Sequence, residues 1–212
     1  MRGAILAGGG ATRFSGRPKG LELVGGARIL DRLVRVFHDA LGDLPLLVAN
    51  DSAAAAWLPA LRVVPDARAG LGSLGGIYTA VVEAPAPVVC VAWDMPFVTA
   101  ELVRALADGL AGADACLPAS GGRRGVEPLC AAYGPACRAA IETALEAGDL
   151  RAISFHGSVN VHILPASDVQ QFGDPAALFF NVNSADDLTA AEEMWRRASS
   201  RSSDERTQGR RL

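Results

Sequence analysis

Short apolar runs alternate with longer amphipathic segments along almost the whole chain. The apolar runs have the length of strands, and the segments between them repeat their apolar residues at helical spacing. This alternation predicts a single three-layer, doubly wound (Rossmann-like) α/β fold, in which helices cover both faces of a mostly parallel sheet. Strands are predicted at residues 4–6, 46–49, 62–64, 88–93, 115–117, 129–132, 159–164 and 178–182, and helices at residues 29–40, 74–83, 100–110, 135–147 and 185–198. Thr99 is placed to cap the helix at 100–110, and Gly148 to end the helix at 135–147.

The chain has 212 residues, enough for one well-packed domain with little left for a second. No internal repeat or linker divides residues 1–195, so we expect them to form one domain. Residues 196–212 are rich in Ser and Arg and nearly free of large apolar side chains. Such a segment cannot bury enough surface to offset its ordering entropy, so it is predicted to be a disordered basic tail. A solvated terminus is a better interpretation than a contact with RNA or a membrane.

The charge is divided unevenly along the chain. The whole chain carries −3 and the tail +4, which leaves −7 for residues 1–195. Because general nucleic-acid binding requires a basic surface, this balance argues against it. No apolar run approaches the roughly 18 residues that a membrane helix needs, and glycines interrupt the first apolar stretch before it could serve as a secretory signal. We therefore expect a cytoplasmic protein with no membrane contact.

The four cysteines and three histidines form no recognisable chemical group. Neither a C-x-x-C pair nor a histidine at zinc spacing occurs among them. Cys90 and Cys116 lie in apolar runs, so buried free thiols are expected. No Ser/His/Asp or Cys/His arrangement emerges either, which argues against a protein nucleophile.

A glycine-rich loop follows the first predicted strand, with the sequence LAGGGATRFSGRPKGL over residues 6–21. Three consecutive glycines, Gly8, Gly9 and Gly10, let backbone N–H groups approach an anion closely. Arg13 adds a cation, and so does Lys19, the only lysine among the twenty basic residues. The loop lacks the G-K-[ST] of a Walker A motif, and Arg13 stands where a dinucleotide fingerprint needs glycine. Phosphate binding is favoured over the alternative of a plain flexible turn.

Asp94 ends the predicted strand at 88–93, in the sequence VVCVAWDMPFV. A carboxylate at the edge of a buried strand is unfavourable unless it is paired or binds a metal. It could also be a turn residue before the following helix. Mg²⁺ is typically held by one or two carboxylates together with substrate phosphates, and Lys19 and Arg13 are expected to open onto the same crevice. These considerations favour a magnesium ligand.

Two more polar residues follow predicted strands at the same edge. Asn50 could hydrogen-bond a base edge or cap the next helix. Asp66 could contact a ligand or serve in a Pro-Asp turn, and the residue pattern does not separate these alternatives. The glycine-rich segment 70–77 is a second loop where backbone could lie flat against a base or ribose.

These motifs resemble the molybdenum cofactor guanylyltransferases (MobA type), within the wider glycosyltransferase-A-like nucleotidyltransferases. The superfamily opening L-A-G-G-x-x-x-R-M-G with a following Lys is present as residues 6–9, Arg13-Phe14 and Lys19. The guanylyl branch adds segments that appear here as KGL at 19–21, GSLGGI at 72–77, WDMPF at 93–97 and FNVNSADDL at 180–188. The resemblance spans about residues 2–195 in the same order.

The resemblance implies transfer of GMP from GTP to the terminal phosphate of molybdopterin, with Mg²⁺ as cofactor and release of pyrophosphate. It also implies transient contact with other proteins of molybdenum cofactor biosynthesis or with molybdoenzymes. The catalytic residues would be Arg13, Lys19 and Asp94, with Asp94 as the metal ligand. Asn181 and Asn183 would lie on the pterin side. The implied nucleotide-binding residues are Leu6, Ala7, Gly8, Gly9, Lys19, Asn50, Asp66 and Asp94.

Three positions depart from the family pattern: Phe14 replaces Met, Ser73 replaces Pro and Trp93 replaces Cys. None of them removes a charged group, but Ser73-Leu74-Gly75 is looser than Pro-Leu-Ala, which bears on base selectivity. Two alternatives follow. One is a cytidylyltransferase acting on molybdopterin or on a small sugar or polyol phosphate, and the other is a nucleotide-binding module without catalysis.

Overall fold

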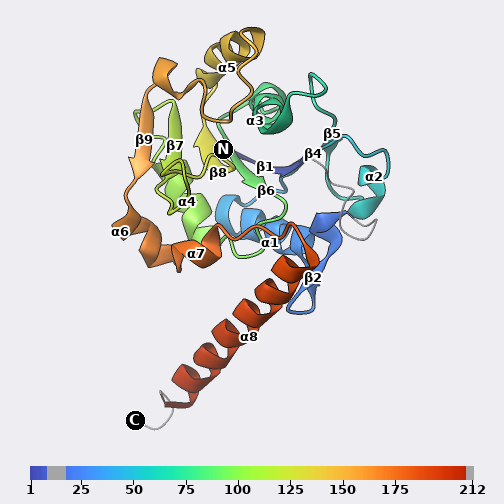
Figure 1. Ribbon diagram of the computed structural model, residues 1–212, viewed down its shortest axis with the longest axis vertical. Coiled ribbons are helices and arrows are strands. Elements are labelled where there is room, and N and C mark those ends of the chain that lie inside the picture. Colours follow the sequence, from blue (N-terminus) through green and yellow to red (C-terminus); the bar gives the residue numbers. More distant parts are fainter. Residues whose placement is uncertain (9–17, 209–212) are drawn as a thin grey trace.

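The computed structural model describes residues 1–8 and 18–208, and its centre is a seven-stranded sheet (Figure 1). The strand order is β5-β4-β1-β6-β8-β7-β9, and six of the strands run in one direction. A separate two-stranded hairpin pairs β2 with β3. The strands are β1 (Arg2–Ala7), β2 (Leu23–Val24), β3 (Ala27–Arg28), β4 (Leu46–Ala49), β5 (Val63–Val64), β6 (Val88–Ala92), β7 (Ala115–Pro118), β8 (Cys130–Tyr133) and β9 (Val161–Leu164).

Helices cover both faces of this sheet, as the alternating pattern predicts. The α-helices are α1 (Ile29–Leu41), α2 (Ala54–Trp57), α3 (Gly72–Glu83), α4 (Ala100–Asp108), α5 (Cys137–Glu146), α6 (Ala166–Val169), α7 (Pro175–Leu178) and α8 (Ala185–Gln208). Short 3₁₀ turns are η1 (Lys19–Leu21), η2 (His156–Ser158) and η3 (Gln170–Phe172).

Two apolar clusters form the core, one on each side of the sheet. Ile5 of β1 packs in the cluster that includes α1 and α4, whereas its neighbour Leu6 packs in the cluster that includes α3 and α5. Figure 1 shows the two helix pairs on opposite sides of the strands. Successive side chains of a strand point to opposite faces, so an apolar run without polar alternation is buried on both sides. This burial confirms the three-layer architecture.

The predicted helix ends are also found. The Thr99 hydroxyl oxygen accepts a hydrogen bond from the N–H of Leu102 at 3.3 Å, which caps α4. Gly148 follows the end of α5 with φ of 74°. A side chain is disfavoured in this left-handed conformation, so glycine is suited to the position.

The structure corrects one predicted element. Residues 178–182 do not form a strand, because α7 ends at Leu178 and the chain then runs irregularly to α8. Their apolar character is explained by burial of Leu178 and Val182 in the α1–α4 cluster. Within the sheet, β8 alone runs antiparallel to both of its neighbours, β6 and β7, which agrees with the prediction of a mostly parallel sheet.

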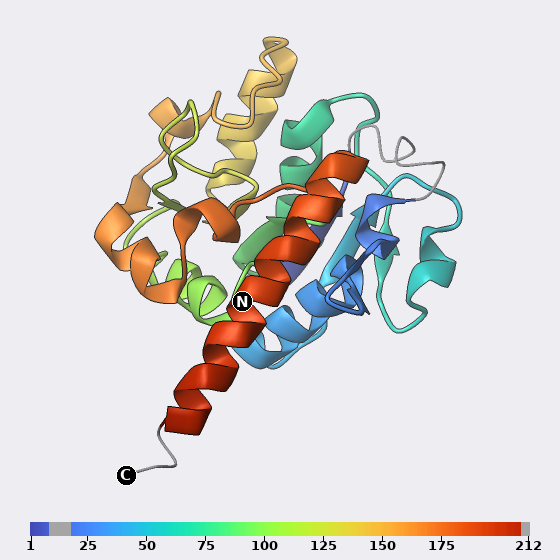
Figure 2. The ribbon, with the colours of Figure 1, turned by 60° about the horizontal axis from the view of Figure 1, so that its bottom comes forward.

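The tail expected to be disordered from residue 196 is helical as far as residue 208, because α8 continues to Gln208. Figures 1 and 2 show this helix projecting beyond the body of the molecule. Near its start, α8 is held by Glu192, which accepts the N–H of Gly25 at 2.9 Å, and by Trp195, whose ring lies 3.8 Å from the guanidinium carbon of Arg32. A helix satisfies its backbone hydrogen bonds internally, so a segment poor in apolar residues can continue one that is already anchored. Residues 209–212 lie outside the described part of the chain.

Cys90 and Cys116 are free and buried, as expected, and so are Cys130 and Cys137. Among the described residues, no helix combines the length and apolarity needed to cross a membrane.

Gly3 tests how tightly β1 packs against α1. A Cβ at this position would lie 2.4 Å from the ring of Phe37, which is fully buried. We expect Gly3→Ala to lower the free energy of unfolding by about 1–3 kcal/mol, since the ring or strand must shift. Gly157→Ala is the matched control, because no atom lies within 4 Å of a Cβ there, and it should change stability by less than about 0.5 kcal/mol. Urea unfolding followed by circular dichroism measures both, and equal midpoints would contradict the prediction.

Candidate active site

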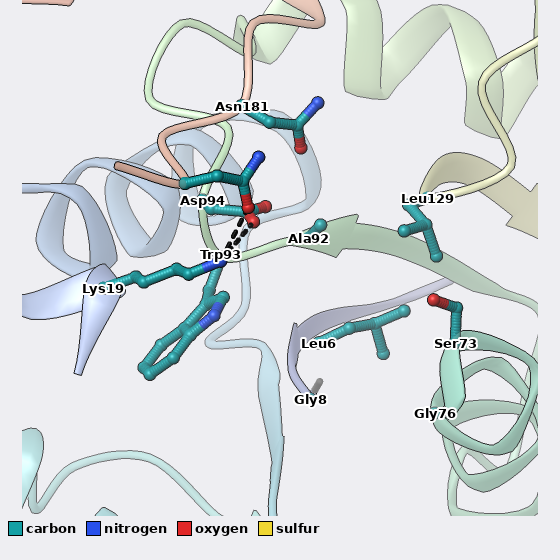
Figure 3. A pocket seen from close by; sticks show the side chains of 11 residues that line it. Leu6, Gly8, Lys19, Ser73, Gly76, Ala92, Trp93, Asp94, Leu129 and Asn181 are labelled. Atoms are coloured by element: carbon teal, nitrogen blue, oxygen red, sulfur yellow. Dashed lines mark hydrogen bonds and ion pairs between the residues drawn. The ribbon is translucent and has the colours of Figure 1, made fainter. Parts of the chain in front are cut away.

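A cavity of about 290 Å³ opens at the carboxyl ends of β1 and β6 (Figure 3). These two parallel strands are neighbours in the sheet, so the residues that follow them meet at one edge. Later parts of the chain complete the wall. The lining residues are Leu6, Gly8, Lys19, Ser73, Gly76, Ala92, Trp93, Asp94, Leu129, Asn181 and Asn183.

Lys19 points into this cavity from the first position of η1. Its Nζ donates a hydrogen bond to Asn183 Oδ1 at 2.6 Å and lies 3.8 Å from Asp94 Oδ2. The Lys19 and Asp94 side chains are 15% and 16% exposed. The only lysine of the chain and the carboxylate singled out in the sequence are therefore brought together.

Close packing beneath η1 holds Lys19 in this position. Gly20 lies against the indole of Trp93, where an added Cβ would be 2.4 Å from the ring. Trp93 stacks in turn on Trp57 of α2, with ring centroids 5.2 Å apart. Trp93, one of the three departures from the family pattern, thus packs beneath Lys19 as part of the site.

Asp94 lies in a turn two residues beyond the end of β6. Its backbone carbonyl accepts the N–H of Val182 at 2.9 Å, which ties the irregular segment before α8 to this edge of the sheet. Burial raises the pKa of the Asp94 carboxyl, while the nearby Lys19 ammonium acts in the opposite direction. The charged carboxylate is therefore costly here, and a bound cation would stabilise it.

Asn181 and Asn183 both line the cavity, in the segment between α7 and α8. Asn181 donates from Nδ2 to the carbonyl of Phe179 at 2.9 Å. The N–H of Asn183 is held by Asp187 Oδ2 at 2.9 Å. The segment 180–183 is thus held at Asn181 and at Asn183. The two side chains line the same cavity as Lys19 and Asp94.

Asn50 and Asp66 follow β4 and β5 and bind each other. Asn50 Nδ2 donates to Asp66 Oδ2 at 2.7 Å, and the N–H of Asp66 donates to Asn50 Oδ1 at 2.8 Å. Asn50 does not cap α2, whose N-cap is Ala53. Both residues are absent from the lining of the 290 Å³ cavity. They form an exposed polar pair farther along the same sheet edge.

The remaining predicted residues divide into three groups. Leu6 and Gly8 line the cavity, whereas Ala7 is buried in the core and does not. Gly9 and Arg13 lie outside the described residues.

The sequence analysis missed Ala92 and Leu129 as lining residues. Leu129 precedes β8, and its carbonyl accepts the N–H of Ala92 at 2.8 Å. The antiparallel direction of β8 brings the start of this strand to the edge where parallel strands have their ends. No residue pattern in the chain indicated that reversal.

The described residues contain no group of three or more His, Cys, Asp and Glu side chains that could hold a metal ion. Within them the cavity offers Asp94 as its one carboxylate. This donor set fits a hard cation that takes most of its oxygen ligands from substrate phosphates and water.

Comparisons with known proteins identify the family of the chain. A profile of the MobA-like NTP transferase domain matches residues 3–160. A probable molybdenum cofactor guanylyltransferase of Pelotomaculum thermopropionicum is 34% identical over 91% of this chain and 92% of its own length. One from Chloroflexus aggregans is 33% identical over 89% of this chain and 91% of its own length.

A solved structure points to the same relatives. The crystal structure of molybdopterin-guanine dinucleotide biosynthesis protein A from Archaeoglobus fulgidus superposes with a TM-score of 0.75 at 28% identity, covering 92% of this chain and 98% of that one. The chain belongs to the MobA-like NTP transferase family.

Proposed function

We propose that this protein transfers GMP from GTP to the terminal phosphate of molybdopterin and releases pyrophosphate, as a step of molybdenum cofactor biosynthesis. The observation that carries the proposal is the meeting of Lys19 and Asp94 in one cavity, at the carboxyl ends of β1 and β6. The names of the relatives supply the substrates, since each curated relative cited above is a probable molybdenum cofactor guanylyltransferase.

In the proposed reaction, a terminal phosphate oxygen of molybdopterin attacks the α-phosphorus of GTP. A new P–O bond forms as the bond to the β-phosphate oxygen breaks, and pyrophosphate leaves with that electron pair. Lys19 stabilises negative charge on the triphosphate and the departing pyrophosphate, because its ammonium is compact and already held by Asn183. Arg13 is assigned the same role from its place in the loop sequence. Catalysis then rests on alignment and electrostatics rather than on a protein nucleophile.

We assign Mg²⁺ to Asp94. When bound, the ion would polarise phosphate oxygens and neutralise developing charge. Asp94 suits this role because its carboxylate is largely buried, faces the cavity and, among the described residues, has Lys19 as its one cationic partner, at 3.8 Å. We assign Leu6, Gly8, Asn50 and Asp66 to the nucleotide and Asn181 and Asn183 to the pterin side.

We also propose that the enzyme works in the cytoplasm. Its four cysteines are buried free thiols, the form that a reducing compartment maintains.

Pyrophosphate release by the purified protein with molybdopterin and Mg²⁺ tests the proposal, with GTP and CTP compared. We expect release with GTP and little with CTP. Release with CTP alone would replace the guanylyl assignment with the cytidylyl alternative. No pyrophosphate release with either nucleotide, combined with measurable GTP binding, would support the non-catalytic module instead.

A further inference from the structure

A second cavity, of about 630 Å³, adjoins the one that holds Lys19 and Asp94. The two share Asn181 as a lining residue. The second cavity lies on the β7–β8 side, where the loop between these strands meets the start of α7. The polar pair Asn50–Asp66 lies toward the other end of the sheet, after β4 and β5. A volume of this size suits a small organic molecule.

Glu127 is the half-buried carboxylate in the wall of this second cavity. Its Oε1 accepts the N–H of Leu129 at 3.0 Å, and its own N–H donates to the carbonyl of Pro118 at 3.1 Å. Backbone and side chain are thus both fixed. Among the described residues, no hydrogen bond to Oε2 accompanies the one to Oε1, so this oxygen is available to a ligand.

The other carboxylate of the cavity, Asp174, is placed differently. It is exposed, and its Oδ1 caps α7 by accepting the N–H of Ala176 at 2.9 Å. Water competes for a ligand's hydrogen bonds at an exposed carboxylate far more than at a half-buried one. Of the two carboxylates in this cavity, Glu127 is therefore the one better placed to discriminate between ligands.

The surroundings of Glu127 determine which ligand it suits. Burial raises the pKa of its carboxyl, the hydrogen bond from Leu129 and the nearby Arg124 lower it, and the negative Asp94 adds to the increase. An anionic group would be repelled here, while neutral N–H donors would satisfy the carboxylate oxygens. Phe179 adds an apolar aromatic surface to the same cavity. This combination fits a planar heterocycle that presents adjacent N–H donors at one edge.

We propose that this second cavity holds the heterocyclic end of the acceptor and that Glu127 selects it by accepting hydrogen bonds from a 2-amino-4-oxopyrimidine edge. The inference rests on the proposed function, because it takes the acceptor to be a pterin whose phosphate reaches past Asn181 toward Lys19. Guanine carries the same edge, so the test must separate acceptor from nucleotide. The position on the β7–β8 side, away from Asn50 and Asp66, favours the acceptor.

Binding of free pterin and of lumazine, followed by ligand fluorescence, is the first measurement. Lumazine has an oxo group in place of the 2-amino group, so it replaces a donor with an acceptor. The wild type should bind pterin roughly 10-fold or more tightly than lumazine, because the 2-oxo oxygen of lumazine would face the half-buried Glu127 carboxylate without donating a hydrogen bond to it. Glu127→Gln should remove or reverse this preference, because its amide can donate to the 2-oxo group. The glutamine side chain keeps an oxygen that can accept the N–H of Leu129, so the local fold is preserved.

Transfer kinetics provide the second measurement. Glu127→Gln should raise KM for molybdopterin roughly 10-fold or more and leave KM for GTP unchanged. Glu146→Gln, on the exposed face of α5, is the matched control and should change neither value.

Several results would overturn the inference. They are an unchanged pterin preference in Glu127→Gln, no pterin binding to the wild type up to millimolar concentration, or a rise in KM for GTP instead of molybdopterin. A wild type that binds pterin with this preference but transfers no GMP would instead refute the proposed function and leave the role of Glu127 standing.

Discussion

Replacing Lys19 by alanine should lower kcat for pyrophosphate release about 10²–10³-fold, the usual cost of removing one preorganised group from the transition state. The ammonium is fixed by Asn183 at 2.6 Å and is only 15% exposed, so it needs little reorganisation when charge develops on the phosphates. Lys19→Arg should restore only part of the rate, because the planar guanidinium is larger than the ammonium and η1 is packed closely on Trp93. Single-turnover measurements with saturating GTP would separate this effect from product release.

Arg138→Ala is the control for loss of a cation elsewhere. Arg138 lies on α5 in an exposed pair with Glu142, and its removal should leave turnover within about twofold of the wild type. Urea unfolding should show that Lys19→Ala lowers the free energy of unfolding by about 1–3 kcal/mol, since the hydrogen bond to Asn183 is lost and the largely buried Asp94 carboxylate loses its cationic partner. Near-normal turnover in Lys19→Ala would exclude Lys19 from the catalytic role.

Replacing Asp94 by asparagine should lower kcat/KM by about 10²-fold or more without weakening the fold. Asparagine has almost the same shape, and the backbone hydrogen bond from Val182 to residue 94 does not depend on the side chain. Burial raises the pKa of the Asp94 carboxyl, which means that the folded protein holds the charged form at a cost. Removing that charge should therefore keep the free energy of unfolding the same or raise it, as is common when a desolvated functional group is neutralised.

Two measurements check this prediction. Pyrophosphate release across a range of Mg²⁺ concentrations should show a higher metal requirement in Asp94→Asn. Intrinsic fluorescence provides a readout that does not depend on turnover, because Trp93 is adjacent to Asp94 in the cavity wall. A Mg²⁺-dependent change with GTP should be present in the wild type and lost in the variant. A variant with normal metal dependence would remove Asp94 from the metal site, and one that unfolds in mild urea would contradict the stability prediction.

The local pattern of residues was enough to determine the layers of the fold. Strands such as residues 88–92 carry apolar side chains at every position, and only a sheet covered on both faces buries all of them. The ends of α4 and α5 were equally local, because Thr99 and Gly148 act on the helix turn next to them. The positions of Lys19 and Asp94 followed from topology, since residues after neighbouring parallel strands must meet at one edge.

Three features could not be obtained from the sequence in this way. The direction of β8 depends on which strands pair. The apolar pattern of a strand of four residues carries no information about that direction. Residues 178–182 resemble a strand because they are mostly apolar, but the α1–α4 cluster buries Leu178 and Val182 without a sheet. Glu127 reaches its cavity only because β8 is reversed, which places the start of that strand beside the end of β6.

The sequence by itself therefore determined most of the strands and helices, because these depend on spacing within a few residues. It also determined that Lys19 and Asp94 meet at the carboxyl edge, because each follows one of two neighbouring parallel strands. The tertiary structure decided how Asn183 meets Lys19 across 164 positions and on which side of Asp94 the second cavity opens. Those outcomes depend on contacts between distant segments, whose closure is governed by packing of the whole core rather than by any local pattern.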